Sequence, residues 1–255
     1  MKLKLPDRTN KPRSKGLSNL VDNGYGLVEL ADKLDLCADY VDIVKLGWAS
    51  AYITKDLYRK VALFEKNGVE ACPGGMMFEL CWWQNKIDDY VAWLKDNNFK
   101  MVEVSNGSLD IPELQKNKMV EFFANKGFIV LSEVGSKDIT KVSPPDEWAK
   151  QVKNDLNAGA WKVILEGRAD ASAGVYRSDG TLIDSIINRV LTDIPADQII
   201  FEAPHKSQMV WFLNRLGSNV NIGNVSLGEI LNLETLRLCL RGDTVMTFHN
   251  NNMQH

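Results

Sequence analysis

Short apolar runs alternate with amphipathic segments along the whole chain. There are eight such runs, and their centres lie 21 to 38 residues apart. They begin at Asn19, Tyr40, Val69, Lys100, Phe128, Trp161, Gln198 and Asn219. This spacing leaves room for one helix and two loops between successive runs, and short continuous apolar runs are typical of buried strands. The pattern therefore predicts eight buried strands with helices between them.

The segments between the runs carry apolar residues at helical spacing. In residues 54–66, Leu57, Val61 and Phe64 fall on one face, which is typical of a surface helix packed on a core. Similar patterns predict helices over residues 84–97, 112–126, 145–158 and 226–239.

Strands that alternate with helices pair in parallel, because each helical crossover returns the chain in the same direction. The sequence therefore predicts the α/β class and a single-domain (β/α)8 TIM barrel, whose usual length of about 250 residues the chain matches. We expect an N-terminal lead-in over 1–18, the barrel over 19–245 and a flexible tail over 246–255. An open doubly wound sheet is the alternative, although no GxGxxG motif follows the first run.

Composition narrows the possible partners. The 255 residues are 45% hydrophobic and 25% charged, with a net charge of -3, so no basic field suggests nucleic acid or an anionic membrane as a partner. The longest apolar runs are too short to span a membrane, and the basic N-terminus lacks the apolar core of a secretory signal. Four cysteines without a CxxC pair indicate reduced thiols and a cytoplasmic protein.

Polar residues cluster where the predicted strands end. The run FIVL at Phe128 is followed within a few positions by Glu133, Gly135 and Lys137. Other polar residues at strand ends are Asp22, Lys45, Glu79, Glu103, Ser105, Glu166, Arg168, Glu202, Asn221 and Asn224, with His205 just beyond the seventh run. In a (β/α)8 barrel these ends build the active site, and buried charges are costly unless they are paired or bind an ion.

The residue types at these ends favour one kind of chemistry. Several carboxylates without a histidine or cysteine cluster favour a hard, oxygen-ligated ion, most simply Mg²⁺. Lysines and an arginine at the same end suit a small anion bearing phosphate or carboxylate. Any single acid could instead form a salt bridge or cap a helix, and Glu79 could simply lie early in a helix. Arg237, Arg241 and Asp243 follow the last helix, near the opposite face, where a structural role or a subunit contact is favoured.

Several of these segments also resemble one known family. The motifs are KLGWAS, CPGGMMFE, EVSNGS, SEVGSK, FEAPHK, VNIGN and LETLRLCLRGDT, which run in order from about Val21 to Thr244. Together they resemble the phosphosulfolactate synthase family. The resemblance implies a (β/α)8 barrel that adds sulfite to phosphoenolpyruvate with Mg²⁺, giving (R)-2-phospho-3-sulfolactate, the opening step of coenzyme M biosynthesis in methanogens. It also implies a homo-oligomer, such as a trimer.

The resemblance suggests roles for the strand-end residues. Lys137 is the expected general acid, and Lys45 and Arg168 are expected to bind phosphate, carboxylate or sulfite. The metal ligands are expected to be Glu103, Glu133 and Glu166. The remaining candidates for substrate binding are Asp22, Ser105, Asn106, Glu202, His205, Asn221 and Asn224.

The chain also departs from the family pattern near the predicted site. The departures are at Ala49, Met76, Asn106, Ala169 and His205. They leave two alternatives open besides the synthase. One is a divergent enzyme that uses another nucleophile or an enolate-type substrate. The other is a non-catalytic barrel, since the family is also similar to plant heat-stress-associated proteins.

Overall fold

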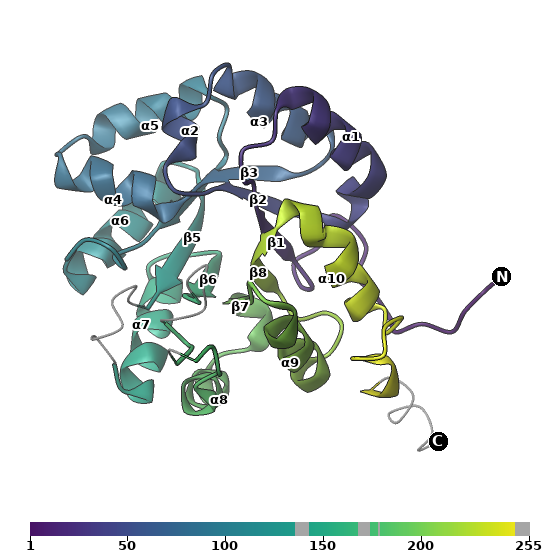
Figure 1. The fold of residues 1–255 in the computed structure, drawn as a ribbon. Helices are drawn as coiled ribbons and strands as arrows, with labels where there is room; N and C mark the ends of the chain where they lie inside the picture. Colours follow the sequence, from purple (N-terminus) through teal and green to yellow (C-terminus); the bar gives the residue numbers. More distant parts are fainter. Residues whose placement is uncertain (136–142, 168–173, 178, 248–255) are drawn as a thin grey trace.

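Eight parallel strands surrounded by helices form the protein (Figure 1). The structure is a computed structural model, and it describes residues 1–135, 143–167, 174–177 and 179–247. The strands are β1 (Ser18–Val21), β2 (Ile43–Leu46), β3 (Glu70–Pro73), β4 (Met101–Val104), β5 (Ile129–Val134), β6 (Lys162–Leu165), β7 (Ile199–Glu202) and β8 (Ile222–Ser226). The helices are α1 (Leu27–Cys37), α2 (Ser50–Ile53), α3 (Leu57–Lys66), α4 (Gly75–Trp83), α5 (Ile87–Asp96), α6 (Glu113–Asn125), α7 (Pro145–Asn157), α8 (Asp184–Asp193), α9 (Lys206–Leu216) and α10 (Ile230–Arg237).

The strands close on themselves almost completely. Their hydrogen-bonded order is β3-β2-β1-β8-β7-β6-β5-β4, so the first strand pairs with both the second and the last. Strands β3 and β4 contact each other, and no ladder pairing joins them in the described residues. The predicted (β/α)8 barrel is therefore confirmed, and the open-sheet alternative is wrong.

The helix predictions were less complete than the strand predictions. The segments 112–126 and 145–158 correspond closely to α6 and α7, whereas 84–97 begins later, at Ile87. The alternative that Glu79 lies in a helix is confirmed by α4, but the residue range of α4 was not predicted, because its sequence GMMFELCWW is apolar on nearly every side and shows no helical periodicity. None of the described helices is long and apolar enough to cross a membrane.

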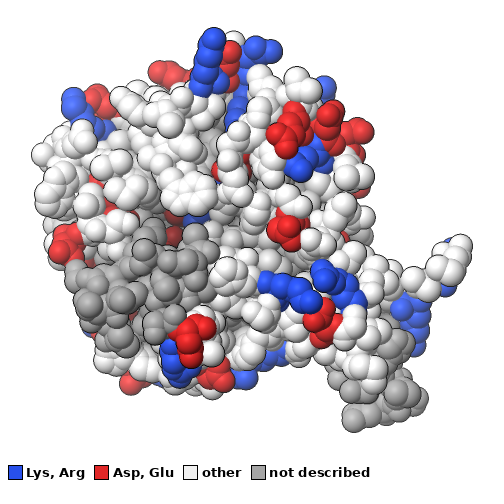
Figure 2. Space-filling view, in the orientation of Figure 1, with Lys and Arg blue, Asp and Glu red and all other residues white. Residues whose placement is uncertain are grey.

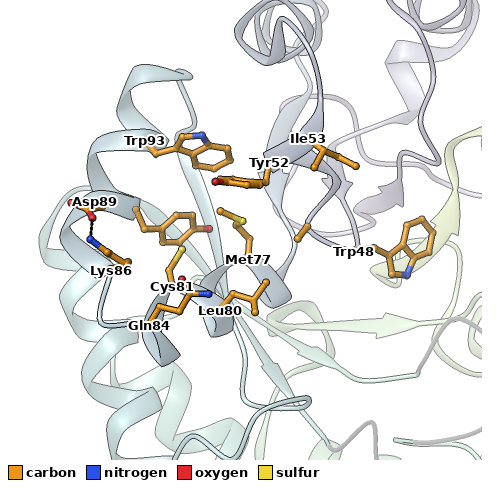
Figure 3. Close-up of a pocket in the computed structure, with 12 residues that line it drawn as sticks. Trp48, Tyr52, Ile53, Met77, Leu80, Cys81, Gln84, Lys86, Asp89 and Trp93 are labelled. Carbon is orange, nitrogen blue, oxygen red and sulfur yellow. Dashed lines mark ion pairs between the residues drawn. The ribbon is translucent and has the colours of Figure 1, made fainter.

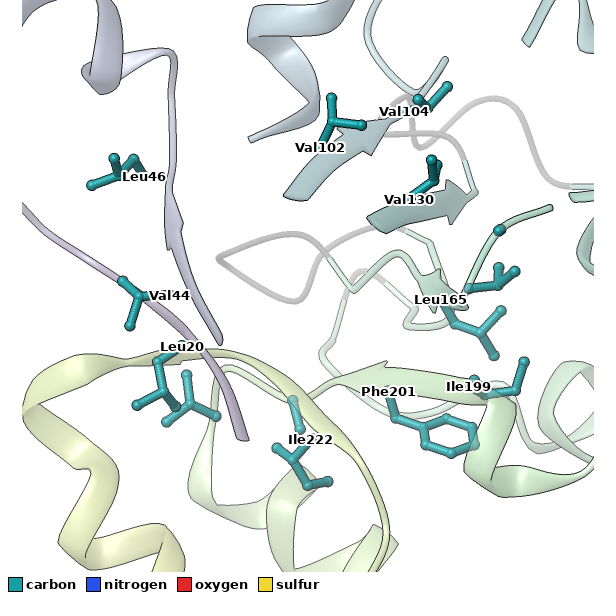
Figure 4. Packing of buried hydrophobic residues seen from close by; sticks show 14 of the residues in the cluster. Leu20, Val44, Leu46, Val102, Val104, Val130, Leu165, Ile199, Phe201 and Ile222 are labelled. Carbon is teal, nitrogen blue, oxygen red and sulfur yellow. The ribbon is translucent and has the colours of Figure 1, made fainter. Parts of the chain in front are cut away.

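The two faces of the sheet carry two separate apolar layers. Outward side chains such as Val44, Val102 and Val130 belong to the large core shared with the helices (Figure 4). Inside the barrel lies a second buried cluster, made of Ile43, Cys72, Met101, Leu131, Ile164 and Ile200. Because side chains alternate along a strand, the residues two positions further on also point inward. The inner cluster is therefore the apolar floor beneath the inward-pointing side chains at the carboxyl-terminal ends of the strands.

The amino-terminal end of the barrel is closed by structural contacts. Arg237 is completely buried and donates hydrogen bonds to the backbone carbonyls of Leu17, Ser218 and Val220 at 2.6–2.9 Å. The expected structural role of Arg237 is confirmed, since a buried guanidinium with these partners closes the barrel end.

The N-terminal lead-in contacts the barrel through charged side chains. Arg8 forms an ion pair with Glu234 at 2.9 Å, and Lys11 donates to the carbonyl of Val41 at 2.6 Å. These contacts hold the segment against the end of the barrel that Arg237 closes. Of the predicted flexible tail, residues 248–255 lie outside the described residues.

Candidate active site

Four glutamates and one lysine converge inside the carboxyl-terminal end of the barrel. Glu103, Glu133, Glu166 and Glu202 are each at most 2% exposed, and Lys45 is 9% exposed. Each glutamate follows a residue of the inner apolar floor by two positions, as in Met101 and Glu103. Strand periodicity therefore points all four carboxylates into the barrel, beyond that floor.

Lys45 lies among three of these carboxylates. Its Nζ donates to Glu202 Oε1 at 3.1 Å and lies 3.5 Å from Glu103 Oε2 and 3.9 Å from Glu133 Oε2. Burial alone lowers the pKa of this amine, but the surrounding carboxylates, Glu103 foremost, outweigh burial and raise its pKa well above the ordinary value. Lys45 is therefore a firmly charged ammonium in this structure.

Backbone amides hold two of the glutamates in place. The N–H of Gly75, at the first turn of α4, donates to Glu103 Oε1 at 2.7 Å. The N–H of Gly167 donates to Glu202 Oε2 at 2.9 Å, and Asn224 Nδ2 donates to the same oxygen at 3.1 Å. Glycine is required at position 75, because a Cβ there would lie 2.2 Å from Ser105 Oγ. Sequence reasoning missed both amides, since only the fold brings them to the carboxylates; the PGG motif was the one available signal.

Three of the carboxylates can share a metal ion. One oxygen each from Glu133, Glu166 and Glu202 lies within 4.8 Å of the others. Carboxylate oxygens are the ligands that Mg²⁺ prefers, so this donor set fits a hard divalent cation. The set differs from the predicted one in that Glu202 takes the place of Glu103.

A cavity of about 430 Å³ opens above these groups. Its described lining also includes Trp48, Gly74, Met76, Ser108 and Asn224. This volume lies in the range of small-molecule sites, about 300–1,000 Å³. Acidic and basic residues are interspersed on the described part of the face seen in Figure 2.

A second, larger cavity of about 640 Å³ lies beside the mouth, against α2, α4 and α5 (Figure 3). Tyr52, Met77, Leu80 and Trp93 give it a mostly apolar lining, and Trp48 lines both cavities. Lys86 and Asp89, which form an ion pair with each other, also line this cavity. We place the chemistry in the smaller cavity, because the buried carboxylates and Lys45 lie there.

Asp22 is a strand-end residue with a structural environment. Its Oδ1 accepts hydrogen bonds from the N–H groups of Gly24 and Tyr25 at 2.7 and 2.9 Å, and its Oδ2 lies 2.5 Å from Lys60 Nζ. The carboxylate thus organises the turn after β1. Asp22 is not among the described residues that line the cavity.

Ser105 and Asn106 also make contacts within their own loop. Ser105 Oγ donates to Glu79 Oε1 at 2.5 Å, and Glu79 Oε2 accepts from the N–H groups of Ser108 and Leu109. Asn106 Nδ2 donates to the carbonyl of Ile111 at 3.1 Å. Glu79 therefore anchors the loop after β4, a function that the sequence did not reveal.

The remaining candidates are scattered. His205 is exposed at the start of α9, where its N–H donates to Gln208 Oε1. The prediction that Asn221 lies at a strand end of the mouth is wrong: it precedes β8, and its amide donates to the carbonyls of Asp197 and Ile199 at the opposite end of the barrel. Lys137, Arg168 and Ala169 lie outside the described residues.

The fold and the site together define a (β/α)8 barrel with an acidic, lysine-containing pocket at its carboxyl-terminal mouth. Residues 6–243 match the family model of (2R)-phospho-3-sulfolactate synthase (ComA). The chain belongs to this family.

Individual relatives agree with this assignment. The chain is 38% identical over 245 residues to phosphosulfolactate synthase of Bacillus subtilis, covering 95% of this chain and 97% of the relative. It is 36% identical over 245 residues to the enzyme of the same name from Methanothermobacter thermautotrophicus, covering 94% and 95%. It is also 24% identical over 266 residues to Protein HEAT-STRESS-ASSOCIATED 32 of Arabidopsis thaliana, covering 92% and 89%.

A solved structure supports the fold alone. The 3-hexulose-6-phosphate synthase of Salmonella typhimurium aligns with a TM-score of 0.53 at 17% identity, covering 86% of this chain and 97% of the other.

Proposed function

We propose that this protein adds sulfite to phosphoenolpyruvate, giving (R)-2-phospho-3-sulfolactate, with Mg²⁺ bound at the barrel mouth. Family membership supports the reaction. The observation that carries the proposal is the convergence of Glu133, Glu166 and Glu202 beside Lys45 in a cavity of suitable size.

Glu133, Glu166 and Glu202 are the proposed metal ligands. Their oxygens lie within 4.8 Å of one another, and all three side chains are buried on the apolar floor. When bound there, Mg²⁺ would supply positive charge that stabilises the negative charge developing on the substrate carboxylate. Asn224 and the N–H of Gly167 would hold Glu202 in its orientation by their hydrogen bonds to Oε2.

The proposed addition forms one bond and consumes one proton. The sulfur lone pair of sulfite forms a C–S bond to the methylene carbon, and the electron pair of the C=C bond moves toward the carbon that bears phosphate and its carboxylate. A proton then adds to that carbon, and the phosphate ester stays intact. The chain must therefore supply one proton donor and positive charge for an anionic substrate.

Lys137 is the proposed proton donor, and Lys45 and Arg168 the proposed cationic groups. Lys45 holds its place among the carboxylates through the contact with Glu202 at 3.1 Å. Lys137 follows β5 by three residues. Gly135, which lies between them, has φ +127°, and a Cβ there would lie 2.5 Å from Trp148. Only glycine fits where the chain leaves β5 for the segment that carries Lys137.

The test is consumption of phosphoenolpyruvate by the purified protein with Mg²⁺, with and without sulfite, with products analysed by mass spectrometry. The proposal expects a sulfite-dependent product with the mass of the adduct. Substrate binding without a sulfite adduct would favour an enzyme with another nucleophile. Neither binding nor consumption would favour a non-catalytic barrel.

Two lysine variants sharpen this test. Lys137→Ala should abolish turnover while retaining the fold and Mg²⁺ binding, because it removes only the proton donor. Lys118→Ala is the matched control, since Lys118 lies exposed on α6 and should leave turnover unchanged. An active Lys137→Ala variant would remove that lysine from the mechanism. The proposed homo-oligomer, such as a trimer, can be checked by light scattering on the same samples.

A further inference from the structure

A buried ion pair lies directly behind one of the proposed metal ligands. Lys116 on α6 and Asp155 on α7 are both completely buried, and their Nζ and Oδ2 atoms lie 2.7 Å apart. The same Nζ donates to the backbone carbonyl of Glu133 at 2.6 Å. A lysine on the outer side of the barrel thus contacts the backbone of a residue whose carboxylate lies inside.

The ion pair is connected to the strand at two successive residues. Besides the contact between Lys116 and the Glu133 carbonyl, Ser132 Oγ donates to Asp155 Oδ2 at 2.7 Å. Asn117 Nδ2 donates to the other oxygen, Asp155 Oδ1, at 2.7 Å. Both oxygens of the carboxylate are therefore hydrogen-bonded, and the network joins α6, α7 and the end of β5.

The Glu133 carbonyl lies where regular strand pairing ends. Along β5 the carbonyls of Val130 and Val134 accept from residues on the β6 side, so the carbonyl of Glu133 points to the β4 side. The pairing with β4 ends one residue earlier, at Ser132 opposite Val104. The ammonium of Lys116 thus takes a position that a strand N–H occupies in a regular sheet.

We propose that Lys116 and Asp155 are positioning residues that fix where the Glu133 carboxylate lies. The inference rests on the proposed function in one respect: Glu133 is taken to be a metal ligand. The physical basis is that a ligand at the end of a strand, such as Glu133 on β5, keeps its orientation only if its backbone is held. Groups that orient metal ligands from outside the first coordination sphere typically change metal affinity about 10- to 100-fold when removed.

A purely structural ion pair is the competing explanation. Breaking a buried pair destabilises any protein, because one charge is left without its partner. Stability alone therefore cannot separate the two explanations. The position of the Glu133 carboxylate and the affinity for Mg²⁺ can.

The principal variant is Lys116→Met, compared with Lys162→Met. Lys162 is also a buried lysine, 5% exposed, and its Nζ donates to a backbone carbonyl, that of Asp197, at 2.6 Å at the other end of the barrel. Both variants lose one ammonium-to-carbonyl hydrogen bond, but only the first also loses an ion pair, that with Asp155, and the contact behind Glu133.

The experiment combines calorimetric titration of the full chain with Mg²⁺ and crystal structures of both variants. We expect Lys116→Met to weaken Mg²⁺ binding about 10- to 100-fold and to displace the Glu133 carboxylate, with Lys162→Met unchanged in both respects. If Lys116→Met does not fold, the double variant Lys116→Met with Asp155→Leu removes both charges and should fold, with the same effect on Glu133.

The outcomes separate this inference from the proposed function. An unmoved Glu133 carboxylate in the variants would overturn the inference, whether or not the affinity for Mg²⁺ changes. A displaced carboxylate in a protein whose wild type binds no Mg²⁺ would support the positioning role and count against the metal site. Unchanged Mg²⁺ affinity with a displaced carboxylate would remove Glu133 from the ligands and overturn the functional part of the inference.

Discussion

Replacing Lys45 by methionine should destabilise the barrel in a way that Mg²⁺ partly reverses. The ammonium lies 3.1 Å from Glu202 Oε1 and 3.5 Å from Glu103 Oε2, and all three side chains are buried. At these distances and an effective dielectric constant near 20, each attraction is about 5 kcal/mol before the cost of burying the ions is subtracted. Truncating one member of a buried pair typically costs about 3–5 kcal/mol, which is our expectation for Lys45→Met without metal.

The predicted loss of stability in Lys45→Met is large enough to measure by thermal unfolding. For a chain of this size, about 3–5 kcal/mol corresponds to a decrease in Tm of roughly 6–20 °C. A divalent cation bound to the carboxylates replaces part of the missing positive charge. A ligand that binds only the folded state also stabilises it by mass action. Millimolar Mg²⁺ should therefore raise the Tm of Lys45→Met more than it raises the Tm of the wild type.

Lys60→Met is the matched control for this prediction. Lys60 is also a buried lysine near the mouth, with its Nζ 2.5 Å from Asp22 Oδ2, but its carboxylate partner belongs to a turn and not to the acidic cluster. Its loss should lower Tm comparably, and Mg²⁺ should not rescue it beyond the wild-type response. The reasoning would be refuted if Lys45→Met unfolded at the wild-type temperature, or if Mg²⁺ stabilised both variants equally.

Three further predictions concern the surroundings of the site and the closed end of the barrel. Ala49 has φ +53°, a conformation that costs a non-glycine residue about 1–2 kcal/mol. Ala49→Gly should therefore raise the free energy of unfolding in urea by about 1 kcal/mol, whereas Ala51→Gly inside α2 should lower it. Changes of the same sign in the two variants would refute the strain at Ala49. Burial raises the pKa of the Cys72 thiol well above its ordinary value, so an alkylating reagent at neutral pH should modify Cys72 only after unfolding, as peptide mass spectrometry can show. Arg237→Met should lower the free energy of unfolding by about 3 kcal/mol or more, because it leaves buried backbone carbonyls without a donor. Arg241→Met changes a partly exposed residue and should alter the free energy of unfolding by less than about 0.5 kcal/mol. Equal losses in the two variants would contradict the structural role of Arg237.

Strands and their charged ends could be predicted from the sequence because both depend on local pattern. An apolar run of four residues is enough to identify a buried parallel strand. The side-chain period of two then places Glu103 on the same side as Met101. The same argument applies to each of the other three glutamates of the cluster, so the acidic pocket was predictable as a set.

The rest of the site depends on contacts that no local pattern encodes. The N–H groups of Gly75 and Gly167 reach glutamates 28 and 35 residues away in sequence, and backbone donors leave no trace in residue type. Asn221 was misplaced for a different reason. The last apolar run, NVNIGN, carries asparagines at positions 219, 221 and 224, on both sides of Ile222, and pattern alone does not tell which of them precedes the strand.

Strand β5 shows how the stability of this barrel and the geometry of its site depend on the same residues. Inside the barrel, Lys45 lies 3.9 Å from the Glu133 carboxylate, and outside it Lys116 donates to the carbonyl of the same residue. Burying an ion pair is costly, and replacing both of its members by apolar residues of similar volume is often neutral or stabilising. Two buried ammonium groups acting on one glutamate, from opposite faces of the sheet, are therefore better explained by the need to hold that carboxylate in place than by stability.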